Sequence, residues 1–225
     1  IVALDKATGK ELWRNGRDEG TTWSTPSIVD RGGKPQVIVP ATYKNRGYDL
    51  ATGALVWEGP GLTRNVIPAP VYADGIVYLM SGYRGNAVQA IDLDKAKGDI
   101  TGSDAIVWTL DRDTPYVSSP LLYDNYLYFF KSNNAILSCF DARTGEAHFG
   151  PVRLEGARGF YASPVGANGR VYLASQNGAT LVIKHGSEFE VLATNVLDES
   201  FNASPVVVDK ELYLRGARYL YCIAA

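Results

Sequence analysis

The stretch Asp5-Lys6-Ala7-Thr8-Gly9-Lys10-Glu11-Leu12-Trp13 returns 44 residues later as Asp49-Leu50-Ala51-Thr52-Gly53-Ala54-Leu55-Val56-Trp57. A looser copy runs from Asp92 to Trp108 with an insertion, and another runs from Asp141 to Phe149. Repetition at a fixed period indicates that one supersecondary unit is used several times. The fold is therefore best predicted from the period.

A second repeated element, a small residue followed by proline, keeps a constant phase to the first. Its prolines stand 44, 50, 44 and 41 residues apart, at Pro26, Pro70, Pro120, Pro164 and Pro205. Each period holds four short apolar runs separated by turn residues, with no helical periodicity between them. In the period of Pro120 the runs are Leu121–Tyr123, Tyr126–Phe130, Ile136–Phe140 and one around Phe149.

Four strands in every 40 to 50 residues are typical of β-propeller blades. The sequence therefore predicts an all-β propeller of four-stranded antiparallel blades, forming one domain over residues 1–225. A two-sheet sandwich ranks second because it lacks this strict self-similarity. The prediction places complete blades at 21–59, 62–111, 112–155 and 156–198, two strands of another blade at 1–16, and three strands of another at 199–225.

The strand count bears on whether the ring closes. Two strands plus three strands are one too many for a single closing blade, which favours an arc of a larger ring. A five-bladed ring with Ile1–Leu4 left over is the alternative. An arc would leave two blade faces bare, and such apolar surface predicts self-association.

The combined pattern of Ser-Pro, Val-Tyr and Ala-Ile/Leu-Asp-x-x-Thr-Gly-x-x-x-Trp resembles the repeat of pyrroloquinoline-quinone-type (PQQ-type) propellers. The likeness is greatest to the non-catalytic bacterial lipoprotein of the outer-membrane assembly machinery. The resemblance covers the whole chain, although the fifth unit has lost the motif at Lys184-His185-Gly186. It implies a ring of seven or eight blades and a periplasmic or secreted location.

The composition and charge limit the classes of partner that the chain is expected to bind. A formal net charge of -2 gives no reason to expect nucleic acid, and no stretch reaches the length of a transmembrane span. Ile1–Asp5 reads as part of a strand and lacks signal-peptide features, which leaves open what precedes it.

Several conspicuous residues have structural interpretations. Blade aromatics recur at one phase of the repeat and are expected to pack between blades, at Trp13, Trp57, Trp108 and Phe149. Cys139 and Cys222 fall at one equivalent third-strand position and are expected to fill the core. His148 and His185 have no metal-ligand spacing, so no metal site is predicted. The acidic pairs, such as Asp18-Glu19 and Asp198-Glu199, are expected to be solvated turns.

One face of the blades is a candidate binding surface. Connections from a fourth strand to the next first strand should share a face with the loops between second and third strands, and these segments are rich in Arg, Asn and aromatics. Arg and Tyr are frequent in binding hot spots. The predicted partner-binding residues, nearest the Pro steps, are Trp23, Arg64, Arg112, Tyr116, Tyr161 and Asn202.

Three functions remain open. The first is a non-catalytic binding or scaffold module that takes a protein, peptide or glycan on this face and needs no cofactor. The second is a fragment of a quinoprotein oxidoreductase that binds PQQ with calcium. That subgroup carries an adjacent cysteine pair, which this sequence lacks. The third is a carbohydrate-binding or carbohydrate-active propeller, which would need two suitably separated acids. No catalytic set is evident, and we favour the first.

Overall fold

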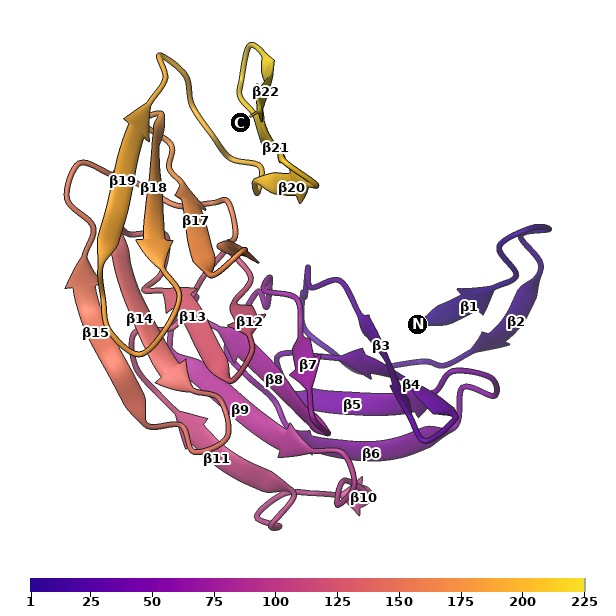
Figure 1. The fold of residues 1–225 in the computed structure, drawn as a ribbon. Helices are drawn as coiled ribbons and strands as arrows, with labels where there is room; N and C mark the ends of the chain where they lie inside the picture. Colours follow the sequence, from indigo (N-terminus) through magenta and orange to yellow (C-terminus); the bar gives the residue numbers. More distant parts are fainter. Residues whose placement is uncertain (225) are drawn as a thin grey trace. The chain divides into compact units, whose positions relative to one another are not determined.

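The computed structural model describes residues 1–224, and all regular elements in that range are β-strands (Figure 1). The chain forms two compact units, Ile1–Leu110 and Asp111–Ala225. Within residues 1–224 the structure contains no helix with the length and apolarity of a membrane crossing.

Unit 1 contains a two-stranded sheet and two blades. The N-terminal sheet pairs β1 (Val2–Leu4) with β2 (Glu11–Arg14). Blade 1 consists of β3 (Ser27–Arg31), β4 (Lys34–Val39), β5 (Lys44–Asp49) and β6 (Leu55–Pro60). Blade 2 consists of β7 (Val71–Ala73), β8 (Ile76–Ser81), β9 (Ala87–Asp92) and β11 (Ile106–Leu110).

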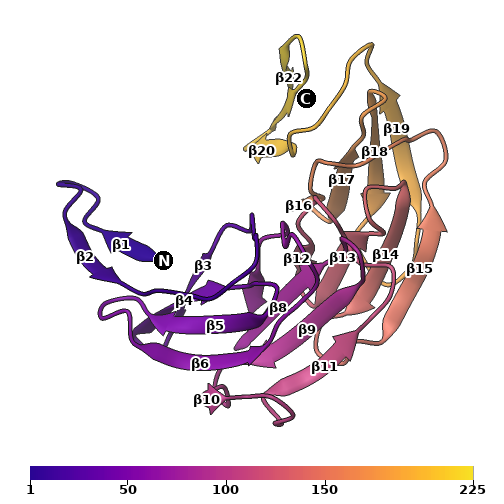
Figure 2. The ribbon, with the colours of Figure 1, turned by 180° about the vertical axis from the view of Figure 1, so that it is seen from behind.

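Unit 2 contains two blades and a three-stranded sheet, coloured from magenta to yellow in Figures 1 and 2. Blade 3 consists of β12 (Leu121–Tyr123), β13 (Tyr126–Phe130), β14 (Ile136–Asp141) and β15 (Ala147–Arg153). Blade 4 consists of β16 (Val165–Ala167), β17 (Arg170–Ala174), β18 (Ala179–Lys184) and β19 (Val191–Val196). The final sheet consists of β20 (Val206–Val208), β21 (Glu211–Arg215) and β22 (Leu220–Ala224).

The predicted fold class is confirmed: along the chain, a two-stranded sheet is followed by four blades, each with four antiparallel strands, and then by a three-stranded sheet. The insertion between Asp92 and Trp108 has a role that the sequence did not predict. It contains β10 (Gly98–Asp99), which pairs in parallel with β6 and so adds a fifth strand to blade 1. Ile100 follows it into the core between blades 1 and 2.

The Asp-x-x-Thr-Gly turns join the third strand of a blade to the fourth. In blade 1 the Asp49 carboxylate accepts hydrogen bonds from the Thr52 N–H and hydroxyl, both at 2.8 Å. The Gly53 N–H closes the turn on the Asp49 carbonyl at 2.9 Å, with φ at +74°. Such a φ favours glycine, and Gly9 and Gly145 adopt nearly the same value.

A buried aromatic faces a small residue across the third and fourth strands. Trp57 lies directly opposite Gly47, and a Cβ on Gly47 would stand 2.2 Å from the indole Nε1. Glycine is therefore required for the fully buried Trp57 ring to lie against β5. Trp13 faces Ala3, Trp108 faces Ala90, and Phe149 faces Cys139 in the same way.

Trp13, Trp57 and Phe149 contact the following sheet. The Trp57 ring joins a core cluster with Val77, Leu79 and Ile91 of blade 2. Its indole N–H donates to the Gln36 side chain at 3.1 Å, whereas that of Trp13 donates to the Leu50 carbonyl in blade 1 at 2.9 Å.

The Ser-Pro steps tie the first strands of successive sheets together. In unit 1 the Ser24 hydroxyl donates to the Pro68 carbonyl at 2.9 Å. In unit 2 the Ser119 N–H donates to the Ser163 hydroxyl, and the Ser163 N–H donates to the Ser204 hydroxyl, both at 2.9 Å. The partners stand one period apart, so the repeated serine is explained by a blade-to-blade hydrogen bond.

The cysteine prediction is half right. Cys139 is fully buried in the core between blades 3 and 4, and burial raises the pKa of its thiol to about 12. Cys222 occupies the equivalent position of the final sheet but is exposed, because no fourth strand with its aromatic covers it within the described residues. The expectation that Cys222 fills a core is therefore wrong.

Candidate functional site

The loop face consists of the inter-blade connections and the loops between second and third strands. Backbone hydrogen bonds join the two kinds of segment, as predicted. In unit 2 the Phe160 N–H donates to the Asn133 carbonyl at 2.9 Å, and the Phe201 N–H to the Ser175 carbonyl at 3.4 Å. In unit 1 the Trp23 N–H donates to the Val66 carbonyl at 2.7 Å, which brings two successive connections together.

Glu19 fixes the loop face of blade 1 and is not a solvated turn residue. Its carboxylate accepts from the backbone N–H groups of Tyr43 and Lys44 at 3.0 Å and from Arg46 Nη1 at 2.7 Å. The side chain is 4% exposed. The prediction for the Asp18-Glu19 pair is therefore wrong for Glu19, because the carboxylate replaces water as the acceptor for a loop backbone.

Glu199 does the same in the final sheet, and the prediction for its pair is wrong in the same way. Its carboxylate accepts from the N–H groups of Ser200, Ala217 and Arg218 at 2.9 to 3.1 Å, and its side chain is 2% exposed. These hydrogen bonds, that of Ser200 first, hold the pKa of Glu199 below its ordinary value.

The predicted binding residues divide between the two units. Trp23 and Arg64 lie in unit 1, where Trp23 is 68% exposed and Arg64 is also exposed. The other four lie in unit 2. Arg112, Tyr161 and Asn202 are exposed there, and Tyr116 is half-buried. Asn202 accepts a hydrogen bond from Gln176 of blade 4 at 2.8 Å.

Arg64 lines a hollow of about 250 Å³ in unit 1. Its lining is drawn from two successive inter-blade connections and the intervening loop of blade 1: Gly20, Thr21, Thr42, Tyr43, Arg64 and Asn65. The Thr42 hydroxyl is buried and has no hydrogen-bond partner among the described residues. Tyr43 is 62% exposed. The hollow thus offers a cation, an unpaired hydroxyl and an aromatic ring.

Neighbouring cations differ from Arg64 in being neutralised. Glu58 forms ion pairs with Lys44 and Arg46, and Glu19 forms another with Arg46. The Lys44 ammonium, with a smaller contribution from Arg46, holds the pKa of Glu58 below its ordinary value although slight burial opposes this. Within residues 1–224 no carboxylate forms an ion pair with Arg64.

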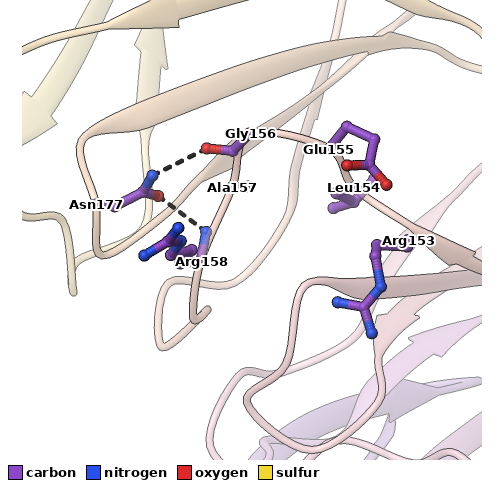
Figure 3. A pocket seen from close by; sticks show the side chains of 7 residues that line it. All are labelled: Arg153, Leu154, Glu155, Gly156, Ala157, Arg158 and Asn177. Carbon is purple, nitrogen blue, oxygen red and sulfur yellow. Dashed lines mark hydrogen bonds between the residues drawn. The ribbon is translucent and has the colours of Figure 1, made fainter.

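A second hollow, of about 410 Å³, lies on the loop face of unit 2 (Figure 3). It is lined by Arg153, Leu154, Glu155, Gly156, Ala157, Arg158 and Asn177. Asn177 fixes its shape by donating to the Gly156 carbonyl and accepting from the Arg158 N–H, both at 2.9 Å. The exposed Arg153 and Arg158 side chains form no ion pair with any residue that the structure describes.

The sequence did not single out Thr42 or Arg153. Arg153 ends a strand, so a search confined to loops passes over it. Thr42 is one of many threonines, and only its missing partner distinguishes it.

A histidine cluster lies on the opposite, turn face of unit 2. His185 lies between Asp124, with Nε2 3.0 Å from Oδ2, and Tyr128, with Nδ1 3.0 Å from the hydroxyl. Its ring stacks on Tyr123 at 4.1 Å. Tyr128 is fully buried, and burial raises the pKa of its hydroxyl. We interpret the cluster as a contact between blades 3 and 4 where the Thr-Gly motif is missing. No group of three His, Cys, Asp or Glu placed to hold a metal occurs among residues 1–224.

Comparison with known proteins decides the family. A family model described as outer membrane protein assembly factor BamB matches residues 1–225. The chain belongs to the BamB family. Its PQQ-like repeats and propeller blades agree with that membership. A search of the curated proteins gave no match.

Solved structures support the BamB-type fold. BamB from Moraxella catarrhalis superposes with a TM-score of 0.68 at 15% identity, over 97% of this chain and 64% of that one. The chain therefore spans less than two thirds of the length of that BamB. The computationally designed protein Ika4 gives a TM-score of 0.52 at 15% identity, over 70% of this chain and 90% of the design.

Proposed function

We propose that this chain is a non-catalytic scaffold module that holds a protein partner on its loop face, outside the cytoplasm. The observation that carries the proposal is the pair of hollows with unpaired arginines, one in each unit. Membership of a family named for outer-membrane protein assembly supports an envelope location and a protein partner.

The chemistry of the hollows indicates an acidic, aromatic-bearing segment as the partner's contact. Arg64, Arg153 and Arg158 offer guanidinium groups that can hold carboxylates through two parallel hydrogen bonds. The exposed rings of Trp23, Tyr43 and Tyr161 offer apolar area at low entropic cost. Loop residues set on a rigid sheet scaffold are typical of binding surfaces.

Site-specific photocrosslinking in a bacterium that produces the full-length protein tests the proposal. A photoreactive phenylalanine would replace Trp23 or Tyr161 on the loop face, or Leu55, which is 51% exposed beside a Thr-Gly turn. We expect a covalent product with one envelope protein from both loop-face positions and none from Leu55. Products from Leu55 alone, or equal yields from all three positions, would contradict the proposal.

A further inference from the structure

The connection from blade 3 to blade 4 carries charged side chains on a backbone that is held from both blades. Leu154 and Ala157 are buried in the core between the two blades. The Leu154 N–H donates to the Ala135 carbonyl at 2.9 Å. Asn177 of blade 4 forms two hydrogen bonds with the same segment, each at 2.9 Å. The exposed side chains of this segment therefore stand on a rigid support, which lowers the entropic cost of binding a ligand.

Three charged side chains of the segment, Arg153, Glu155 and Arg158, line the same hollow of about 410 Å³. All three are exposed, and none forms an ion pair within residues 1–224. By contrast, Lys131 in the loop of blade 3 pairs with Asp113 at 2.8 Å. In Figure 3 neither guanidinium group points toward the Glu155 carboxylate. Two positive charges in one hollow repel each other, so the hollow favours an anion.

The pair of arginines indicates an anion with more than one charge. A carboxylate carries one charge and matches one guanidinium group through two parallel hydrogen bonds. A phosphomonoester carries a charge of about −1.5 to −2 at neutral pH and offers three strong acceptor oxygens. It can therefore accept hydrogen bonds from Arg153 and Arg158 at the same time.

The hollow is larger than a phosphate group alone requires. Its volume of about 410 Å³ lies in the range of roughly 300–1,000 Å³ that is usual for small-molecule sites. The ionised Glu155 carboxylate can only accept hydrogen bonds, and the hydroxyl groups of a ligand are suitable donors. The remaining space and the carboxylate together fit a group that carries several hydroxyls.

We propose that this hollow binds a phosphorylated sugar, with the phosphate between Arg153 and Arg158 and the sugar hydroxyls toward Glu155. The same chemistry occurs in soluble sugar phosphates and in lipids with a phosphorylated sugar as headgroup. The inference does not rest on the proposed function, since it needs no protein partner. A protein partner and the sugar phosphate would compete for Arg158.

Phosphorus NMR titration of the full-length protein with glucose 1-phosphate tests the site. We expect saturable binding that is roughly tenfold weaker in Arg153→Gln and in Arg158→Gln, because each variant removes one charged hydrogen-bond donor. Arg170→Gln is the matched control, since Arg170 is exposed on blade 4 and lies outside the lining of the hollow. Glucuronate, a sugar acid with a single charge, should bind roughly tenfold more weakly than the probe.

Two further comparisons test the sugar and the source of the phosphate. Glu155→Gln should lower the ratio of the affinity for glucose 1-phosphate to that for inorganic phosphate by roughly threefold, the effect of one hydrogen bond. Retention on phosphatidylcholine vesicles that carry phosphatidylinositol 4-phosphate would assign the site to a lipid headgroup. Binding of glucose 1-phosphate without retention on these vesicles would assign it to a soluble sugar phosphate.

Three results would overturn the proposal: no saturable binding of glucose 1-phosphate, equally tight binding of glucuronate, or binding that is unchanged in both arginine variants. An unchanged affinity ratio in Glu155→Gln would overturn the contact between this carboxylate and the sugar. These results would leave the crosslinking test of a protein partner intact, because that test uses no phosphate.

Discussion

Each blade has two faces at which one strand ends and the next begins. The turn face carries the turns between third and fourth strands, and the loop face carries the loops between second and third strands and the inter-blade connections. The two faces stabilise these reversals of the chain with different side chains. On the turn face, the same Asp, Thr and Gly recur in three sheets with nearly the same hydrogen bonds. On the loop face, each sheet fixes its loop with another group, such as Glu19, Asn177 or Glu199. Uniform chemistry marks the part that serves the fold, and under the proposed function the variable chemistry with unpaired cations marks the part that binds a partner.

Replacing tryptophan in the two settings should show the largest contrast. Trp57→Ala should lower the free energy of unfolding by about 3–5 kcal/mol, because it empties the core between blades 1 and 2. Trp23→Ala, on the loop face, should change it by less than about 0.5 kcal/mol. Urea unfolding followed by circular dichroism measures both, and equal effects would remove the distinction.

The buried loop-face carboxylate should have the next effect. Glu19→Gln should cost about 1–2 kcal/mol, because the amide cannot satisfy both loop N–H groups and Arg46 equally well. Asp18→Asn alters the exposed neighbour and serves as the control, with an expected change below about 0.5 kcal/mol. If both variants unfold at the parent's urea concentration, Glu19 does not fix the loop.

The hydrogen bonds of the turn face should make the stability of the fold depend on pH in the acid range. The hydrogen bonds from Thr52, first its hydroxyl and then its N–H, hold the pKa of Asp49 below its ordinary value of 3.8. A depressed pKa in the folded state stabilises the fold above pH 3.8, and that stability is lost as pH falls through the folded value. Asp49→Asn and Thr52→Val should each flatten the fall of the unfolding midpoint below pH 4. A slope identical to the parent's would contradict the turn's electrostatic role.

The repeat made the blades predictable, because strand period and turn residues are local properties of the sequence. It also gave the third-strand register, so that Cys139 and Cys222 were aligned correctly. The repeat did not predict burial. Cys222 is exposed because the fourth strand that would cover it is lacking from the final sheet among the described residues. Local pattern fixes position in a strand, but burial depends on neighbours.

The candidate site was only partly predictable for a similar reason. The loop face could be foreseen from propeller topology, and Arg64 from its place in a connection. The roles of Glu19 and Glu199 could not, because each carboxylate bonds a backbone 18 to 25 residues away, with no side-chain motif at the other end. The sequence could not show which arginines form ion pairs. The structure shows that Arg46 is paired with Glu19 and Glu58, whereas Arg64 has no such pair among the described residues.

One paired measurement tests most directly whether the turn face stabilises the fold while the loop face binds the partner. Two double variants of the full-length protein would be compared by urea midpoint and by photocrosslinking yield from Tyr161: Arg64→Glu with Arg158→Glu, and Asp5→Asn with Asp49→Asn. We predict that the loop-face variant loses most of its crosslink at the parent's stability, and that the turn-face variant keeps its crosslink with a lower midpoint at pH 7. A loop-face variant that crosslinks as well as the parent would contradict the account.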